Sequence, residues 1–230
     1  MSAAEPSRGV TALPGKSQFL PDALQRYVLA HSTPPGTAEQ RLIEETTGLG
    51  GVAEMQVPAE QGVLLTSLTR ALGARNVVEV GTFTGLSSLA IARGLPAGGR
   101  LLTCDVSDEW TAVARRHWAA AGVAHRIELR LGPALATLRA LPAEPHLDLA
   151  FIDADKPGYI GYWDELVPRM RPSGVLLVDN VFFHQRVLEP EPDDANAQAI
   201  KAFNDHARAD GRVDVSMLPV GDGLTLACRR

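Results

Sequence analysis

From residue 76 onward, short apolar runs typical of strands alternate with segments of helical spacing. The strand-like runs lie at 76–81, 100–106, 126–132, 147–154 and 174–180. The helical segments between them lie at 86–95, 109–122, 133–141 and 159–170. This alternation favours a parallel sheet with right-handed crossover helices. We therefore predict an α/β fold with helices on both faces of a mostly parallel sheet.

The two ends of the chain depart from this alternation. Two apolar runs in 213–230 flank a Gly-Asp-Gly turn, which predicts an antiparallel C-terminal hairpin and brings the sheet to seven strands. A further helix is expected at 197–211, after the acidic loop 189–196. Upstream, helices are expected at 19–32, 37–50 and 58–73, behind a polar arm at 1–20. We expect one domain over 1–230, divided into a variable arm and first helix (1–35), N-terminal helices (36–73) and the site-bearing core (74–230).

Composition narrows the possible partners. The chain has 230 residues, of which 45% are apolar and 21% charged, as in soluble globular proteins. A net charge of −5 argues against a nucleic-acid or polybasic membrane-surface role. The N-terminus lacks the apolar core of a secretory signal, and no run is long enough to span a membrane. Cys104 and Cys228 form no metal or disulfide pattern, so we expect buried thiols and a reducing cytoplasm.

Ligands of open parallel sheets bind outside the carboxyl ends of the strands, so each strand end is a candidate wall of one cleft. After the first strand, Gly81 and Gly85 lie in a strand-to-helix turn, where backbone N–H groups can approach a ligand. The spacing is not that of a dinucleotide site. The acid Glu79 inside this motif suits a ligand with a cationic amine better than a pyrophosphate.

The next two strand ends suggest a nucleoside. Asp105 follows Gly85 by twenty residues, and a carboxylate there commonly accepts hydrogen bonds from ribose hydroxyls. Pro133 and Ala134 are small residues against which an adenine edge can lie.

The fourth and fifth strands end in Asp153 and in Asp179-Asn180. Neighbouring parallel strands would bring these three oxygen ligands together. Oxygen ligands without Cys or His favour Mg²⁺, Mn²⁺ or Ca²⁺. The alternative is that these acids cap helices or lie in solvent.

Motifs at all five strand ends and in the C-terminal hairpin resemble the cation-dependent O-methyltransferases of the caffeoyl-CoA and catechol type, which use S-adenosylmethionine. The motifs are EVGTFTGLSSLA, CDV, GPA, FIDADKPGYIGYW, LLVDN and PVGDGLTLA. The resemblance runs from about residue 55 to the C-terminus, whereas the first 35 residues match poorly. It implies a Rossmann-like class I methyltransferase fold and a homodimer.

The resemblance also implies a role for each candidate residue. Glu79, Gly81 and Thr82 would hold the methionine moiety, assisted by Ser87 and the backbone around Val57. Asp105 would bind the ribose and Ala134 the adenine. Asp153, Asp179 and Asn180 would bind the divalent cation, and Lys156 would be the catalytic base. Asp153 would also contact the cofactor and take part in catalysis. The family often has glycine where Gln185 stands, which is a departure on the acceptor side.

The predicted reaction is methylation of one hydroxyl of a small catechol-like molecule with adjacent hydroxyls. A polyketide or macrolide-type hydroxyl is the main alternative acceptor. A nicotinamide-dependent oxidoreductase would require a different glycine spacing. A non-catalytic S-adenosylmethionine-binding module and a metal-independent methyltransferase stay open, although each leaves the acids at 153 and 179 without a purpose. Tyr162, Trp163 and Phe182 could line the acceptor or the adenine, and His184 closely follows the proposed cation ligands. A structural role is the simpler interpretation of each.

Overall fold

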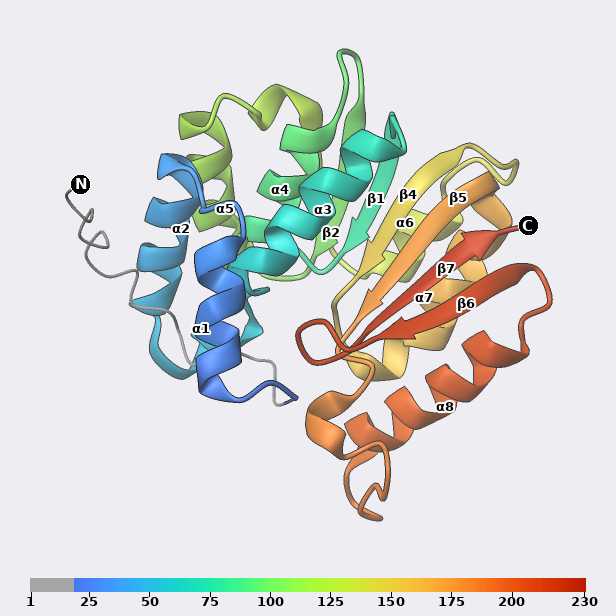
Figure 1. Cartoon of the computed structure of the whole chain (residues 1–230). Helices are drawn as coiled ribbons and strands as arrows, with labels where there is room; N and C mark the ends of the chain where they lie inside the picture. Colours follow the sequence, from blue (N-terminus) through green and yellow to red (C-terminus); the bar gives the residue numbers. More distant parts are fainter. Residues whose placement is uncertain (1–18) are drawn as a thin grey trace.

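The computed structural model describes residues 19–230, so the predicted arm lies almost wholly outside the described residues. One seven-stranded sheet forms the centre of the molecule, in the order β3-β2-β1-β4-β5-β7-β6 (Figure 1). Its strands are β1 (Asn76–Val80), β2 (Arg100–Asp105), β3 (Ile127–Leu131), β4 (Leu147–Ile152), β5 (Met170–Asp179), β6 (Val213–Leu218) and β7 (Leu224–Arg229).

The first five strands pair in parallel with one another, and β7 pairs antiparallel with both β5 and β6. This confirms the predicted parallel sheet with an antiparallel C-terminal hairpin. The strand order reverses direction at β1, which lies between β2 and β4. Because ligands of such sheets bind where the order reverses, the ends of β1 and β4 are the natural place for a site.

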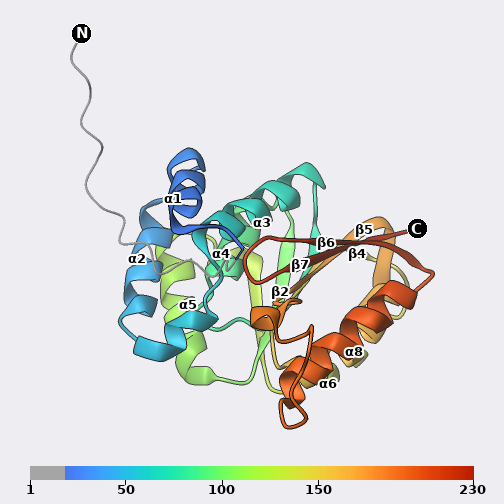
Figure 2. The ribbon, with the colours of Figure 1, turned by 60° about the horizontal axis from the view of Figure 1, so that its bottom comes forward.

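Eight α-helices surround the sheet in the described part of the chain. They are α1 (Asp22–His31), α2 (Thr37–Thr47), α3 (Ala59–Ala71), α4 (Leu86–Gly94), α5 (Asp108–Ala120), α6 (Ala134–Arg139), α7 (Tyr159–Leu166) and α8 (Ala195–Ala209). Short 3-10 turns add η1 (Gly50–Met55), η2 (Ala124–Arg126), η3 (Lys156–Gly158), η4 (Val167–Arg169) and η5 (Phe183–Gln185). Figure 2 shows α3 and α4 on one face of the sheet and α6 and α8 on the other.

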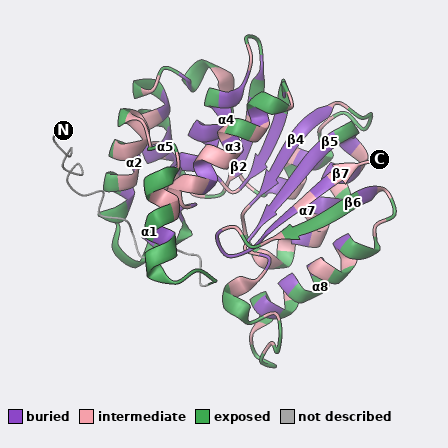
Figure 3. Ribbon diagram, in the orientation of Figure 1, coloured by how far each residue is buried: buried purple, intermediate pink, exposed green. Residues whose placement is uncertain are grey.

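Alternating residues of the central strands build two separate cores. Val77 and Phe151 pack with Leu65 and Leu89 on the side of α3 and α4. Their neighbours in sequence, such as Val78, point to the opposite side, where Trp163 and Phe203 are fully buried. The central strands are accordingly buried on both faces, whereas the edge strand β6 is largely exposed (Figure 3). Continuous apolar runs such as VLLV (175–178) in β5 are therefore expected in a sheet that is covered on both sides.

Some predicted boundaries were wrong, and proline or positive φ angles explain the clearest case. The helix expected over 159–170 ends at Leu166, and Pro168 lies in the 3-10 turn that follows, because proline has no N–H to continue an α-helix. Strand β5 begins at Met170 rather than at 174, with a register shift opposite β4 and a left-handed Ser173 (φ 64°). The helix expected over 37–50 ends at Thr47.

Within residues 19–230, none of the helices combines the length and the apolar character needed to cross a membrane.

Candidate active site

The loop after β1 brings three strand ends into contact. Gly81 donates its N–H to the carbonyl of Cys104 in β2 (2.9 Å), and the N–H of Asp153 after β4 bonds to the carbonyl of Val80 (2.8 Å). Gly81 has φ of +96°, and a Cβ on it would lie 1.8 Å from the carbonyl oxygen of Asp153. Only glycine therefore allows the ends of β1 and β4 to approach this closely.

Asp105, at the end of β2, closes the same loop. Its Oδ2 accepts the N–H groups of Thr82 (2.9 Å) and Phe83 (2.7 Å), and its Oδ1 accepts that of Ser107 (2.8 Å). The carboxylate thus fixes the glycine loop, a role that the sequence pattern did not suggest. Asp105 also lines the large cavity described below. This position is compatible with the predicted contact to a ribose, which stays a prediction.

Glu79 is completely buried beneath this loop. Its Oε2 accepts hydrogen bonds from the hydroxyls of Thr103 (2.6 Å) and Ser88. Burial raises the pKa of the Glu79 carboxyl to about 7, although the neighbouring hydroxyls of Ser87, Ser88 and Thr103 oppose the shift. Within the described residues its Oε1 is buried without a hydrogen-bond partner. An ammonium group is the donor that such an oxygen would accept, so the residue fits the amine of S-adenosylmethionine.

A cavity of about 1660 Å³ opens beside this loop. Most of the predicted cofactor-binding residues line it, namely Val57, Gly81, Thr82, Ser87, Asp105, Ala134 and Asp153. Glu79 is completely buried and is not among the lining residues. Gly132 and Pro133 complete the small-residue wall at Ala134. The cavity is large enough for a nucleoside cofactor together with a small acceptor.

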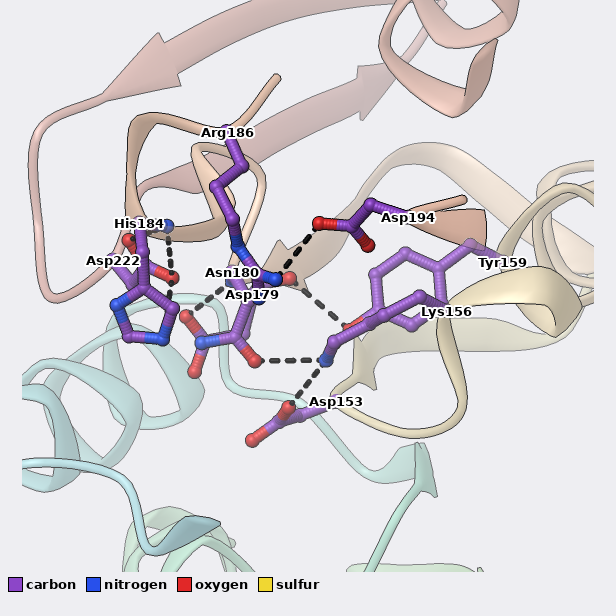
Figure 4. A network of polar contacts seen from close by, with 9 residues as sticks. All are labelled: Asp153, Lys156, Tyr159, Asp179, Asn180, His184, Arg186, Asp194 and Asp222. Carbon is purple, nitrogen blue, oxygen red and sulfur yellow. Dashed lines mark hydrogen bonds and ion pairs between the residues drawn. The ribbon is translucent and has the colours of Figure 1, made fainter. Parts of the chain in front are cut away.

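At the other side of the cavity, Lys156 joins two of the predicted metal ligands. Its ammonium donates to Asn180 Oδ1 (2.8 Å) and to Asp153 Oδ1 (3.3 Å), and Figure 4 shows the three side chains pointing toward one another. Two oxygens from the ends of β4 and β5 therefore converge on the positively charged ammonium of Lys156. This arrangement fits the predicted binding of a divalent ion by oxygen ligands.

The third predicted ligand, Asp179, is nearly inaccessible to solvent. Its Oδ1 accepts the backbone N–H of Asn180 (2.7 Å), and its Oδ2 accepts the side-chain amide of Gln61 (2.7 Å). Asn180 adopts a left-handed conformation (φ 60°), which asparagine tolerates better than most residues. Within residues 19–230, no group of three or more His, Cys, Asp or Glu side chains could hold a metal ion. The predicted set contains only two side chains of these types, Asp153 and Asp179, because its third ligand is the amide of Asn180.

Tyr159, which was not singled out from the sequence, forms a hydrogen bond with Lys156. Its hydroxyl accepts a hydrogen bond from the Lys156 ammonium (2.6 Å) and donates one to the backbone carbonyl of Asp179 (3.1 Å). The ring is completely buried, and this burial raises the pKa of the Tyr159 hydroxyl well above its usual value. Tyr159 therefore stays a neutral hydrogen-bonding group that links the lysine to the end of β5.

The acceptor side of the cavity is bounded by a strained loop. Phe183, His184 and Gln185 have φ angles of 44°, 54° and 65°, which are unfavourable for residues other than glycine. The buried carboxylate of Asp222, in the turn between β6 and β7, accepts the backbone N–H of His184 (2.9 and 3.1 Å). Phe183, His184 and Asp222 all line the cavity.

The aromatic residues considered from the sequence have different places. Tyr162 lines the cavity, and its hydroxyl bonds to Asp155. Trp163 belongs to the core on the side of α8, as its simpler interpretation predicted. Phe182 packs partly buried against the same core.

Comparison with known proteins agrees with this geometry. A family model described as O-methyltransferase matches residues 31–230, which extends the match upstream of the motifs found at residue 55. The probable caffeoyl-CoA O-methyltransferase 2 of Dictyostelium discoideum is 39% identical over 209 residues, covering 89% of this chain and 90% of the relative.

Two solved structures share the fold closely. An O-methyltransferase from Bacillus cereus, in complex with S-adenosylhomocysteine, has a TM-score of 0.82 and 30% identity, covering 90% of this chain and 97% of the other. An O-methyltransferase from Streptomyces achromogenes involved in tomaymycin synthesis, in complex with S-adenosylmethionine, has a TM-score of 0.82 and 31% identity, covering 90% and 96%.

The predicted family and its Rossmann-like fold are thereby confirmed, since the family model spans most of the chain and the relative is similar along nearly its whole length. The chain belongs to the O-methyltransferase family, and by that membership it is an S-adenosylmethionine-dependent enzyme of the caffeoyl-CoA O-methyltransferase type.

Proposed function

We propose that the protein methylates one hydroxyl of a small aromatic molecule with two adjacent hydroxyls, and that the reaction requires a divalent cation, most readily Mg²⁺. The observation that carries this proposal is the convergence of Asp153 and Asn180 on the Lys156 ammonium at the wall of the large cavity. Asp179 lies next in sequence to Asn180 and supplies a second carboxylate. This is the ligand chemistry that Mg²⁺ prefers in proteins.

S-Adenosylmethionine supplies the methyl group as a sulfonium, and its amine suits the unpaired Oε1 of Glu79. A bound divalent cation lowers the pKa of a hydroxyl that coordinates it and fixes its position. Lys156 lines the same cavity and holds or accepts the proton that the hydroxyl loses. The walls around Ala134 and Tyr162 exclude water and align the two reactants.

Adjacent hydroxyls distinguish this proposal from methylation of an isolated hydroxyl, as in a polyketide or macrolide acceptor. Asp153, Asp179 and Asn180 would hold the cation through three side chains, and two adjacent hydroxyls would offer it more oxygen ligands than an isolated hydroxyl would. We also propose a homodimer in a reducing cytoplasm. The low cysteine content, two residues in 230 without a disulfide or metal pattern, supports this compartment.

A panel of matched acceptors tests the substrate class. The protein is incubated with S-adenosylmethionine, Mg²⁺ and either 1,2-dihydroxybenzene or 1,3-dihydroxybenzene, and methylated product is quantified by mass spectrometry. We expect product from the 1,2-isomer at a rate at least tenfold above that of the 1,3-isomer. Equal rates would contradict chelation of adjacent hydroxyls. Methylation of neither isomer, with S-adenosylhomocysteine binding intact by calorimetry, would redirect the search to non-aromatic hydroxyls.

A further inference from the structure

We propose that Gln61 is a positioning residue for the cation site, and that its side-chain amide fixes the carboxylate of Asp179 in the orientation that binds the ion. This inference rests on the cation dependence proposed above. It concerns a residue of α3, which lies far from the strand ends in sequence and carries none of the motifs that identified the site.

The contact between Gln61 and Asp179 is direct and shielded from solvent. Gln61 Nε2 donates to Asp179 Oδ2 over 2.7 Å, although 118 positions separate the residues in sequence. Gln61 is completely buried, and Asp179 is only 1% exposed. An ionised carboxylate only accepts hydrogen bonds, so the amide must present its N–H group to Asp179. The contact therefore fixes the orientation of both side chains.

This orientation of the Gln61 amide has an energetic cost, because it leaves the amide oxygen without a hydrogen bond. With Nε2 on Asp179, the other end of the amide, Oε1, is buried without a hydrogen-bond partner among the described residues. A buried polar atom without a partner is destabilising, so its presence in a native structure calls for an explanation. A purely structural position here would be filled better by an apolar side chain.

The C-terminal turn is shaped around this glutamine. A Cβ on Gly221 would lie 2.6 Å from Gln61 Oε1, so a side chain at position 221 would collide with the amide. The neighbouring Asp222 holds the His184 N–H, as described above. One turn thus packs against Gln61 and also holds the loop 183–185, of which Phe183 and His184 line the cavity. This arrangement indicates that the Gln61 amide belongs to the candidate active site and not to the general core.

The Asp179 carboxylate is consequently held at both oxygens. Oδ1 accepts the backbone N–H of Asn180, and Oδ2 accepts the amide of Gln61. Groups that orient a metal ligand in this way typically change metal affinity by about 10- to 100-fold when they are removed. Loss of the amide should let the carboxylate rotate and should weaken cation binding without touching the cofactor cavity, because Gln61 is not one of its lining residues.

The test measures binding of Mn²⁺ alone to the full chain by electron paramagnetic resonance, which does not depend on turnover. Gln61→Met keeps the size of the side chain and removes the donor, and Gln61→Asn keeps the amide but shortens its reach. Gln40→Met is the matched control, because the Gln40 amide, as far as residues 19–230 show, donates to Glu44 at the surface of α2. Thermal melting and S-adenosylhomocysteine calorimetry establish that each variant is folded.

We expect the Mn²⁺ dissociation constant to rise by about tenfold or more in both Gln61 variants. In Gln40→Met it should be unchanged. The affinity for S-adenosylhomocysteine should stay within about twofold of the wild type in every variant. Under turnover, the metal concentration for half-maximal rate should rise while the rate at saturating metal stays close to that of the wild type.

The two proposals fail differently. If the wild type binds Mn²⁺ and the folded Gln61 variants bind it equally well, only the positioning role is overturned. If the wild type binds no Mn²⁺, the cation dependence of the proposed function falls and the positioning role falls with it.

Discussion

Lys156 and Asn180, which lie after different strands, are joined by a hydrogen bond of 2.8 Å from the lysine ammonium to the asparagine Oδ1. The same ammonium contacts Asp153 Oδ1 and the hydroxyl of Tyr159. The proposed catalytic base is thus held by the cation ligands and by a buried phenol. Its position is determined by the ends of β4 and β5 rather than by a flexible loop.

Replacement of Lys156 should reduce catalysis and leave cofactor binding intact. We expect Lys156→Met to lower kcat by about 10²- to 10⁴-fold, the usual contribution of a positioned acid or base. The S-adenosylhomocysteine dissociation constant, measured by calorimetry, should stay within about threefold of the wild type, a margin well below 1 kcal/mol on the tenfold-per-1.4-kcal/mol scale. Lys201→Met, on the exposed face of α8, is the matched control. Retention of wild-type kcat in Lys156→Met would remove the lysine from the mechanism.

Gly81 should tolerate no side chain, because of its contact with Asp153. An added Cβ at Gly81 would overlap the backbone carbonyl of Asp153, whereas Gly122 has a similar positive φ of 72° and nothing within 4 Å. We expect Gly122→Ala to lose about 1 kcal/mol of unfolding free energy, the conformational penalty alone. Gly81→Ala should lose several times as much, or fail to fold. Urea denaturation measures both, and equal losses would contradict the steric argument.

The affinity for the cofactor should depend on pH through Glu79. The pKa of its buried carboxyl is about 7 in the folded protein, so the group is largely uncharged below this pH. A ligand ammonium favours the ionised form, so S-adenosylhomocysteine affinity should rise by up to about tenfold per pH unit toward pH 7 and level off above it. Calorimetry at pH 6, 7 and 8 measures the trend. Glu79→Gln should bind more weakly and lose this dependence; an unchanged slope in the variant would rule out Glu79 as its source.

The same shift has a consequence for the stability of the ligand-free protein. The pKa of Glu79 is raised from 4.5 to about 7 on folding, so the folded state binds the proton more tightly than the unfolded state. The contribution of Glu79 to the free energy of unfolding therefore falls as pH rises from 4.5 to about 7, and is constant above that. Glu79→Gln should reduce this part of the pH dependence in urea denaturation curves.

Gln185 should be replaceable by glycine with a gain in stability. Its φ of 65° is unfavourable for a residue with a Cβ. Relief of this strain is expected to add about 1 kcal/mol to the unfolding free energy of Gln185→Gly relative to Gln185→Ala, which keeps the Cβ. Thermal or urea denaturation of the two variants gives the comparison. A glycine variant less stable than the alanine variant would show that the side chain makes a contact that outweighs the strain.

Much of the fold and many of the candidate residues could be predicted because the relevant signals are local. An apolar run that ends in an acid identifies both a strand and the residue at its carboxyl end. Asp105, Asp153 and Asp179 were found in this way, and parallel pairing does bring the ends of their strands to one edge of the sheet. The glycine expected by family resemblance at position 185 likewise coincides with a left-handed residue.

What escaped prediction depends on contacts between distant segments. Gln61 in α3 carries no local signal, and Asp222 was visible only as part of the last turn; only the fold places them against Asp179 and His184. Tyr159 reads as an ordinary core aromatic until its hydroxyl is seen between Lys156 and β5. The end of the helix expected over 159–170 was also missed, because a single proline overrides the apolar periodicity there.

The most direct test of the proposed chemistry is the dependence of methyl transfer on a divalent cation. The protein is incubated with S-adenosylmethionine and a 3,4-dihydroxylated aromatic acceptor, first with Mg²⁺, then with EDTA, and then with EDTA followed by excess Mg²⁺. Methylated product is measured by mass spectrometry for the wild type and for Asp153→Ala. We expect product only where free Mg²⁺ is present and only from the wild type. Product formation that is indifferent to EDTA would contradict the role assigned to Asp153, Asp179 and Asn180.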